Sequence, residues 1–219
     1  MQSPRDSARF VCGGYLVAAP AERASWMSEQ LVPSSVVSAS DCIVEFPFAA
    51  WAESASRGSP RSDRKFAIAC QVAREQGSLS ESGLFSQRDA ALALRRRLLP
   101  PDSPHLAFSI ELPTDLVDSF LEDALEGAWF DRIAQGEQPG EGRSIGFDVL
   151  GFDFTGFHSY LCNGLERDFD ELLGARPNRY GLIDKLEVAR RCAEHCNQEG
   201  TGAEPVLWLP WRVVLHHRA

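Results

Sequence analysis

Two strand-length segments near the C-terminus are apolar on both faces. In residues 145–154, Ile145, Phe147 and Val149 fall on one face, and Leu150, Phe152 and Phe154 fall on the other. The change of face after Val149 indicates either a β-bulge or a strand that is covered on both sides. Residues 206–215 are also apolar on both faces, with Pro210 predicting a bulge or bend. We therefore expect residues 206–215 to lie inside a sheet, and residues 145–154 either to contain a bulge or to be covered on both faces.

Further strand patterns occur in the N-terminal half. Residues 10–19 form an apolar run, and residues 105–112 alternate between apolar and other side chains, which predicts a half-buried strand. Residues 42–48 are strand-like, although Pro47 places them at a sheet edge or a strand end. Residues 66–72 fit either a strand or the start of a helix.

Helical patterns are interspersed among these strands, at residues 21–31, 90–99, 114–125, 163–173 and 184–196. The second helix is preceded by Ser86 and Asp89 in the spacing of a capping box, and Thr114 is in position to cap the third. Strands and helices do not alternate as βαβ units. The order predicts an α+β fold, with a mixed or antiparallel sheet and helices packed on it.

The best linker in the sequence is residues 135–143, which are rich in glycine and polar residues and contain no apolar side chain. It either separates an N-terminal α+β region (1–134) from a C-terminal α+β region (144–219), or it is a long loop within one domain.

The net charge limits the classes of partner that the protein is expected to bind. The 219 residues carry 22 basic and 31 acidic side chains, a formal charge of −9. Nucleic acids and anionic membranes require a basic face, so neither is expected as a partner. Residues 10–21 fit a first strand better than a signal peptide, because Asp6 interrupts the would-be basic region. No apolar run approaches the length of a membrane span. We therefore expect a cytoplasmic protein.

Motifs for common chemistries are absent from the sequence. There is no GxGxxG after a strand, no GxxxxGK[ST], no HExxH and no GxSxG. These absences count against nucleotide binding, zinc-protease and serine-hydrolase functions.

The cysteines offer one catalytic alternative. Six cysteines at irregular spacing, without a CxxC, indicate reduced thiols. Cys162 and His158 lie four residues apart where a helix is expected to begin, so Cys162 could act as a nucleophile with His158 as its base. Cys192 and Cys196 share the apolar face of the last predicted helix, which favours core packing over metal binding. We expect no metal and no cofactor.

Acidic and polar side chains provide candidates for contacts with a protein partner. Asp148 and Asp153 flank a glycine in the strand at 145–154, and the helix at 114–125 has a strongly acidic outer face. Trp residues are also frequent at binding hot spots when they are exposed. The predicted partner-binding residues are Asp148, Asp153, His158, Tyr160, Asn163, Glu166, Asp115, Asp118 and Glu122.

The C-terminal third resembles a known protein class. Residues 146–166 (GFDVLGFDFTGFHSYLCNGLE), 178–184 (NRYGLID) and 205–211 (PVLWLPW) resemble bacterial immunity proteins of polymorphic toxin systems. The resemblance implies an acidic, cytosolic α+β protein that has no catalytic residues and blocks a toxin by binding it.

We therefore expect a non-catalytic binding protein, an immunity-type inhibitor whose acidic groups steer a basic toxin domain. Its segment 156–163 is one expected contact. Two alternatives remain open, a Cys/His-dependent enzyme that uses Cys162 and His158, and a scaffold domain of a larger assembly.

Overall fold

The computed structural model describes residues 8–44, 72–73, 79–80, 83–123, 133–153 and 156–216. The described elements are β1 (Phe10–Ala18), β2 (Ala21–Glu22), β3 (Ser35–Val36), α3 (Arg88–Leu98), β4 (Leu106–Pro113), the 3-10 turn η2 (Thr114–Leu116), α4 (Val117–Asp123), β5 (Arg143–Phe152), β6 (Phe157–Ser159), α6 (Glu166–Leu173), α7 (Leu186–Cys196) and β7 (Trp208–Leu215).

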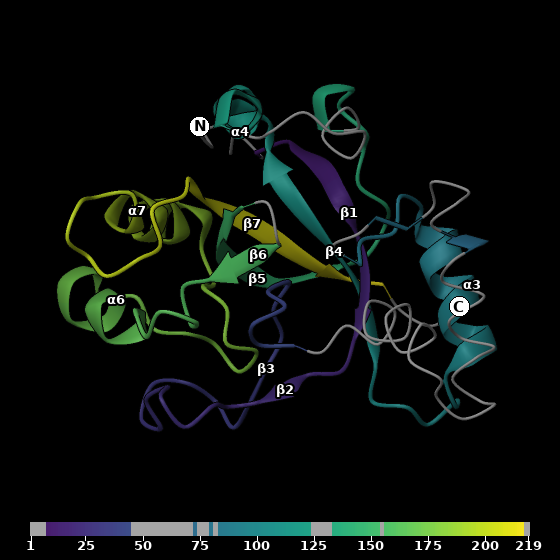
Figure 1. The fold of residues 1–219 in the computed structure, drawn as a ribbon, viewed down its shortest axis with the longest axis horizontal. Helices are drawn as coiled ribbons and strands as arrows, with labels where there is room; N and C mark the ends of the chain where they lie inside the picture. The colour runs from purple at the N-terminus through teal and green to yellow at the C-terminus, as the bar shows by residue number, and fades with distance from the viewer. Residues whose placement is uncertain are drawn as a thin grey trace, which may run out of the picture.

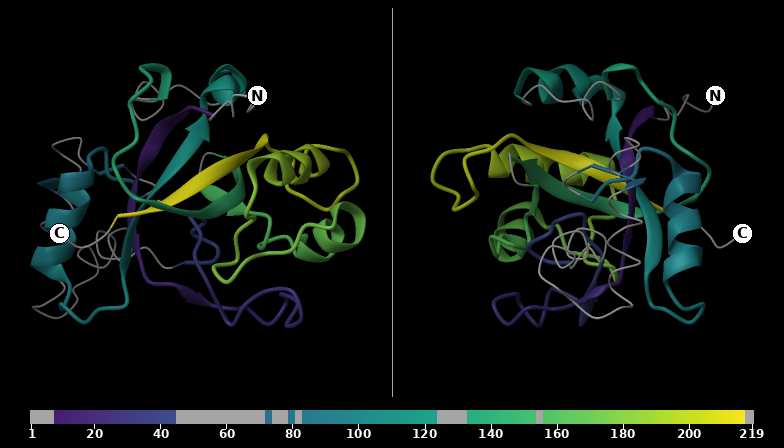
Figure 2. Two further views of the ribbon diagram at one scale, coloured as in Figure 1. Left: turned by 180° about the vertical axis from the view of Figure 1, so that it is seen from behind. Right: turned by 45° about the vertical axis from the view of Figure 1, so that its right-hand side comes forward.

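A five-stranded antiparallel sheet organises the molecule, with the strand order β1-β4-β7-β5-β6 (Figure 1). A small second sheet pairs β2 with β3. The helices lie around the main sheet, with α3 at one end and α6 and α7 at the other (Figure 2). This arrangement confirms the predicted α+β class.

The sheet takes strands from both sides of residues 135–143. β1 and β4 precede this segment, β5, β6 and β7 follow it, and β4 pairs directly with β7. The segment also protects a sheet edge, because the Cys12 amide on the edge strand β1 donates a hydrogen bond to the Glu137 carbonyl (2.8 Å).

Both faces of the central strands are buried, as their apolar pattern predicts. On β5, Phe147 and Val149 pack in the core under α6 and α7, while Leu150 packs in the core on the other side. β7 lies between β4 and β5, yet Pro210 fits there. Its register partner is Val149 on β5, whereas the pairing of β7 with β4 begins at Arg212. The missing N–H of Pro210 therefore lies where β7 has one neighbour.

Several local predictions differ from the structure. Residues 21–31 do not form a helix, because Ala21 and Glu22 pair with β3 and the chain then turns, with the Arg23 side chain bonded to the Val32 carbonyl. Residues 41–44 form a turn and not a strand, while 45–48 lie outside the described residues. Gly174 ends α6 in the left-handed conformation. None of the cap residues assigned to α3, η2, α6 and α7 makes a side-chain cap hydrogen bond.

β4 is buried on both faces, although its alternation predicts a half-buried strand. On this side of β4, Ala107 packs with Ala91 and Leu92 of α3, and Glu111 pairs with Arg212, its register partner on β7. Glu111 is fully buried and accepts hydrogen bonds from Arg212 Nε (2.6 Å) and from the Ser109 hydroxyl (3.0 Å). Burial raises the pKa of the Glu111 carboxyl, and Arg212 acts in the opposite direction. The ion pair thus joins the N-terminal and C-terminal parts of the sheet.

Breaking this pair should be strongly destabilising. We expect Arg212→Leu to lower the free energy of unfolding by about 3–5 kcal/mol, because a buried carboxylate loses its partner. The double variant Glu111→Leu/Arg212→Leu should recover most of that loss. The exposed pair Arg190–Asp115 provides the control, and Arg190→Leu should change stability by about 1 kcal/mol or less. Urea unfolding measures all of these, and equal losses for the two arginine variants would contradict the prediction.

Candidate functional site

A cluster of serine, cysteine, histidine and carboxyl side chains forms where residues 38–42 cross the β5–β6 hairpin. The hairpin places Gly151 opposite His158. At its turn, Asp153 Oδ1 accepts the Gly156 amide (3.2 Å), and the Asp153 amide donates to the Gly156 carbonyl. The turn thereby holds the Asp153 carboxyl beside the imidazole of His158.

Asp153, His158 and Cys42 lie in a row. His158 Nε2 is 3.0 Å from Asp153 Oδ2, and His158 Nδ1 is 3.9 Å from Cys42 Sγ. The carboxylate orients the ring so that its second nitrogen faces the thiol. This is the order of groups in a cysteine–histidine–carboxylate catalytic site, in which the base is itself held by a third residue.

Ser40 positions Cys42. Its hydroxyl accepts the Cys42 amide (3.3 Å), while its carbonyl accepts the amides of Ile43 (3.2 Å) and Val44 (3.0 Å). These bonds form a single helical turn that starts at Ser40. Cys42 stands on this turn as an exposed thiol, so a molecule from solution can reach it.

Cys162, the nucleophile considered from sequence, has a different environment. Its sulfur is 3.1 Å from the Ser40 hydroxyl and accepts the Ser159 amide (3.4 Å). Burial raises the pKa of the Cys162 thiol to about 12, which disfavours the reactive thiolate. Among the described contacts it is Cys42, not Cys162, that faces His158. The pairing of Cys162 with His158 therefore loses its geometric basis.

Asp148 anchors the segment that carries Cys42. Its carboxyl is buried on β5 and accepts hydrogen bonds from Ser38 (2.7 Å) and Ser159 (2.8 Å). Ser38 in turn accepts the Ser40 amide (3.1 Å). Desolvation raises the pKa of Asp148 to about 7, against the opposing effect of the two serine hydroxyls. Asp148 thus ties residues 38–40 to the hairpin beneath them.

Glu204 completes the cluster from the loop before β7. Its Oε1 is 3.7 Å from His158 Nδ1, the same nitrogen that faces Cys42. Its Oε2 is buried and has no hydrogen-bond partner among the described residues. A buried carboxylate oxygen without a partner is energetically unfavourable.

The predicted partner-binding residues differ in how far their side chains are exposed to solvent. Asp148, Tyr160 and Glu166 are buried, so they offer no side chain to a partner in this conformation. The Tyr160 hydroxyl donates to the Gly181 carbonyl, and Glu166 accepts the Ser28 amide. Asp153 and His158 belong to the cluster, and Asn163 is partly exposed. The remaining three lie on η2 and α4 with exposed side chains: Asp115, Asp118 and Glu122.

Cys42 and Glu204 were not identified from sequence. Cys42 lies 116 residues from His158, and it falls in a segment whose apolar pattern favours a strand. The one local signal was Ser40 two residues before it, a spacing that allows a serine to cap a helical turn.

Among the described residues, no three His, Cys, Asp or Glu side chains are arranged to hold a metal ion. Cys12, Cys42, Cys162, Cys192 and Cys196 are free thiols, and Cys70 lies outside the described residues. No helix among the described residues is long and apolar enough to span a membrane. Comparisons with protein-family models, curated proteins and solved structures found no match.

The pKa of Asp148 makes stability depend on pH. A carboxyl with a pKa near 3.9 when unfolded and about 7 when folded binds more protons in the native state between these values. Stability contributed by this group is therefore greatest below about pH 4 and falls by about 1.4 kcal/mol per unit as the pH rises to 7. We expect Asp148→Asn to remove this slope. Urea unfolding at pH 5, 6, 7 and 8 tests it, and parallel pH profiles for the two proteins would contradict the assignment.

Proposed function

We propose that the chain is a thiol-dependent enzyme of the acyl-transfer class, with Cys42 as its nucleophile. The observation that carries this proposal is the orientation of His158, whose Nδ1 faces the Cys42 thiol while Nε2 is bound to Asp153. The three residues come from a turn, a strand and a hairpin turn that the fold brings together.

The geometry supports a two-step reaction. The Cys42 thiol transfers its proton to His158 Nδ1 as its sulfur attacks the acyl carbon, and the leaving group departs with that proton. The product is a thioester on Cys42. Water then attacks the thioester, giving a proton to His158, which returns it to the departing thiolate. Asp153 accepts the Nε2–H throughout and so keeps Nδ1 directed at the sulfur.

Glu204 adds a second carboxylate beside the imidazole. Its Oε1 is 3.7 Å from His158 Nδ1, so it would stabilise the imidazolium that forms when His158 takes the proton of Cys42.

Two measurements test the assignment of Cys42. With iodoacetamide at pH 7, we expect Cys42 to be alkylated at least tenfold faster than Cys162, because the Cys162 thiol is buried and its pKa is raised. His158→Gln should slow the alkylation of Cys42. Incubation with p-nitrophenyl acetate should add one acetyl group, located at Cys42 by mass spectrometry and absent in Cys42→Ser. An unchanged labelling rate in His158→Gln, together with no acetyl-enzyme, would reject the proposal.

A second candidate function is an immunity-type inhibitor that occludes a basic toxin domain in the cytoplasm. One observation favours it. Trp26 is 55% exposed, and its indole N–H donates to the Leu161 carbonyl (3.2 Å), so it lies beside the segment 156–163 that was predicted to contact a partner. Exposed tryptophans are typical hot spots of protein interfaces.

Exposed carboxylates are consistent with the same function. Asp118 and Glu122 lie one turn apart on α4 and are both exposed. Like charges at this spacing destabilise an isolated helix, whereas they would steer a basic partner toward the protein.

Binding and catalysis can be separated experimentally. The tagged protein, exposed to a lysate of its own organism in low and moderate salt, should retain a basic protein at 1:1 stoichiometry. With that protein purified, Trp26→Ala should weaken the affinity by about thirtyfold, as at an interface hot spot. Leu172→Ala, which alters another exposed apolar side chain, should leave affinity unchanged. Cys42→Ala should also bind normally. If neither salt nor the double variant Asp118→Asn/Glu122→Gln changes the association rate, steering by charge is contradicted.

A further inference from the structure

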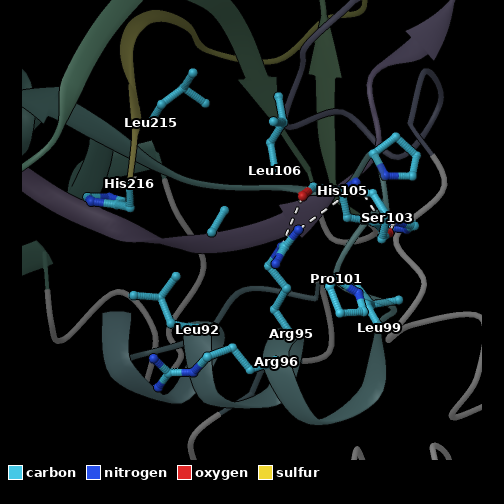
Figure 3. A pocket seen from close by; sticks show the side chains of 12 residues that line it. Leu92, Arg95, Arg96, Leu99, Pro101, Ser103, His105, Leu106, Leu215 and His216 are labelled. Carbon is cyan, nitrogen blue, oxygen red and sulfur yellow. Dashed lines mark hydrogen bonds between the residues drawn. The ribbon is translucent and has the colours of Figure 1, made fainter. Parts of the chain in front are cut away.

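A cavity of about 510 Å³ lies between α3 and the strands β4 and β7 (Figure 3). Leu92, Arg95 and Arg96 line it from the helix, and Leu106 and His216 line it from the strand side. Its size falls within the range of small-molecule sites, roughly 300–1,000 Å³. The cavity is separate from the Cys42 cluster. The helix α3 packs on β1 and β4, whereas that cluster lies at the β5–β6 edge of the sheet.

The described lining combines apolar walls with basic groups. The apolar residues are Leu92, Leu99, Pro101, Pro104, Leu106, Ala107 and Leu215, and the basic or imidazole residues are Arg95, Arg96, His105 and His216. No aspartate or glutamate is among the described lining residues. In a chain with a net charge of −9, this is a local reversal of charge.

The positions of the arginines differ. Arg95 is buried, and it donates from Nε to the His105 carbonyl (3.0 Å), which ties α3 to the loop before β4. Figure 3 shows its guanidinium directed from α3 toward this loop. Arg96 is exposed on the last turn of α3, where its guanidinium can reach a ligand without breaking a structural contact shown for it. We therefore assign recognition of a charged head group to Arg96.

Hydrogen bonds hold His216 in place at the cavity wall. Its Nδ1 faces the Glu141 carbonyl (2.9 Å), and its Nε2 faces the Ser109 hydroxyl (2.9 Å). Because that hydroxyl donates its hydrogen to Glu111, it can accept one from His216. The ring is thus connected through Ser109 to the Glu111 carboxyl.

We propose that this cavity binds a small amphiphilic anion, a molecule with an apolar chain or ring and one anionic oxygen head group. The leucines would cover the apolar body, while Arg96 would bind the head group at the cavity entrance. The site does not depend on the proposed reaction at Cys42.

Decanoate tests this proposal by isothermal titration calorimetry of the full-length protein, with 1-decanol as the uncharged control. We expect one decanoate per chain and binding of decanol that is at least about tenfold weaker. Arg96→Gln should weaken decanoate binding by about tenfold, since a charged hydrogen bond is lost. The matched control is Arg97→Gln, because Arg97 is exposed on the same turn and is not among the cavity residues.

Three results would overturn the proposal. These are no binding at millimolar decanoate, equal affinities for decanoate and decanol, or equal effects of Arg96→Gln and Arg97→Gln. Binding of several decanoates per chain would likewise indicate surface adsorption and count against the site. Cys42→Ser should bind decanoate as the unaltered protein does, which separates failure of this site from failure of the proposed reaction.

Discussion

The ion pair between the buried Glu111 and the partly exposed Arg212 is the interaction on which the rest of the structure depends. It joins β4 to β7 at the point where the N-terminal and C-terminal strands meet in one sheet. A carboxylate in this position is tolerated only because a guanidinium and a hydroxyl satisfy it. From Ser109 the same network continues to His216, which lines the α3 cavity. The ion pair of the sheet is therefore connected by hydrogen bonds to a residue of the cavity wall.

The candidate catalytic cluster depends on a second buried carboxyl. Asp148 holds Ser38 and Ser159, and these bonds dock residues 38–42 on the β5–β6 hairpin. Ser40 contacts both nearby cysteines, whose thiols lie in different environments. It caps the turn of the exposed Cys42 and contacts the sulfur of the partly buried Cys162. The two cysteines near Ser40 therefore differ in expected reactivity, because only Cys42 is both exposed and directed at His158.

The two proposed sites lie near different strands of one sheet. The Cys42 cluster lies at the β5–β6 edge, whereas the amphiphile cavity lies under α3 near β4. Trp26, the residue that favours the inhibitor function, contacts Leu161, the neighbour of the Cys162 that lies against Ser40.

The sequence by itself determined the elements whose signal is local. Apolar residues on both faces of 145–154 and 206–215 identified interior strands, and the spacing of Cys192 and Cys196 identified the buried face of α7, because periodicity records which side of an element avoids water. Only the tertiary structure decided which cysteine faces His158, and that Asp148, Tyr160 and Glu166 are buried. Those outcomes arise from contacts between distant segments and from the desolvation that follows, and neither is encoded in the spacing of neighbouring residues.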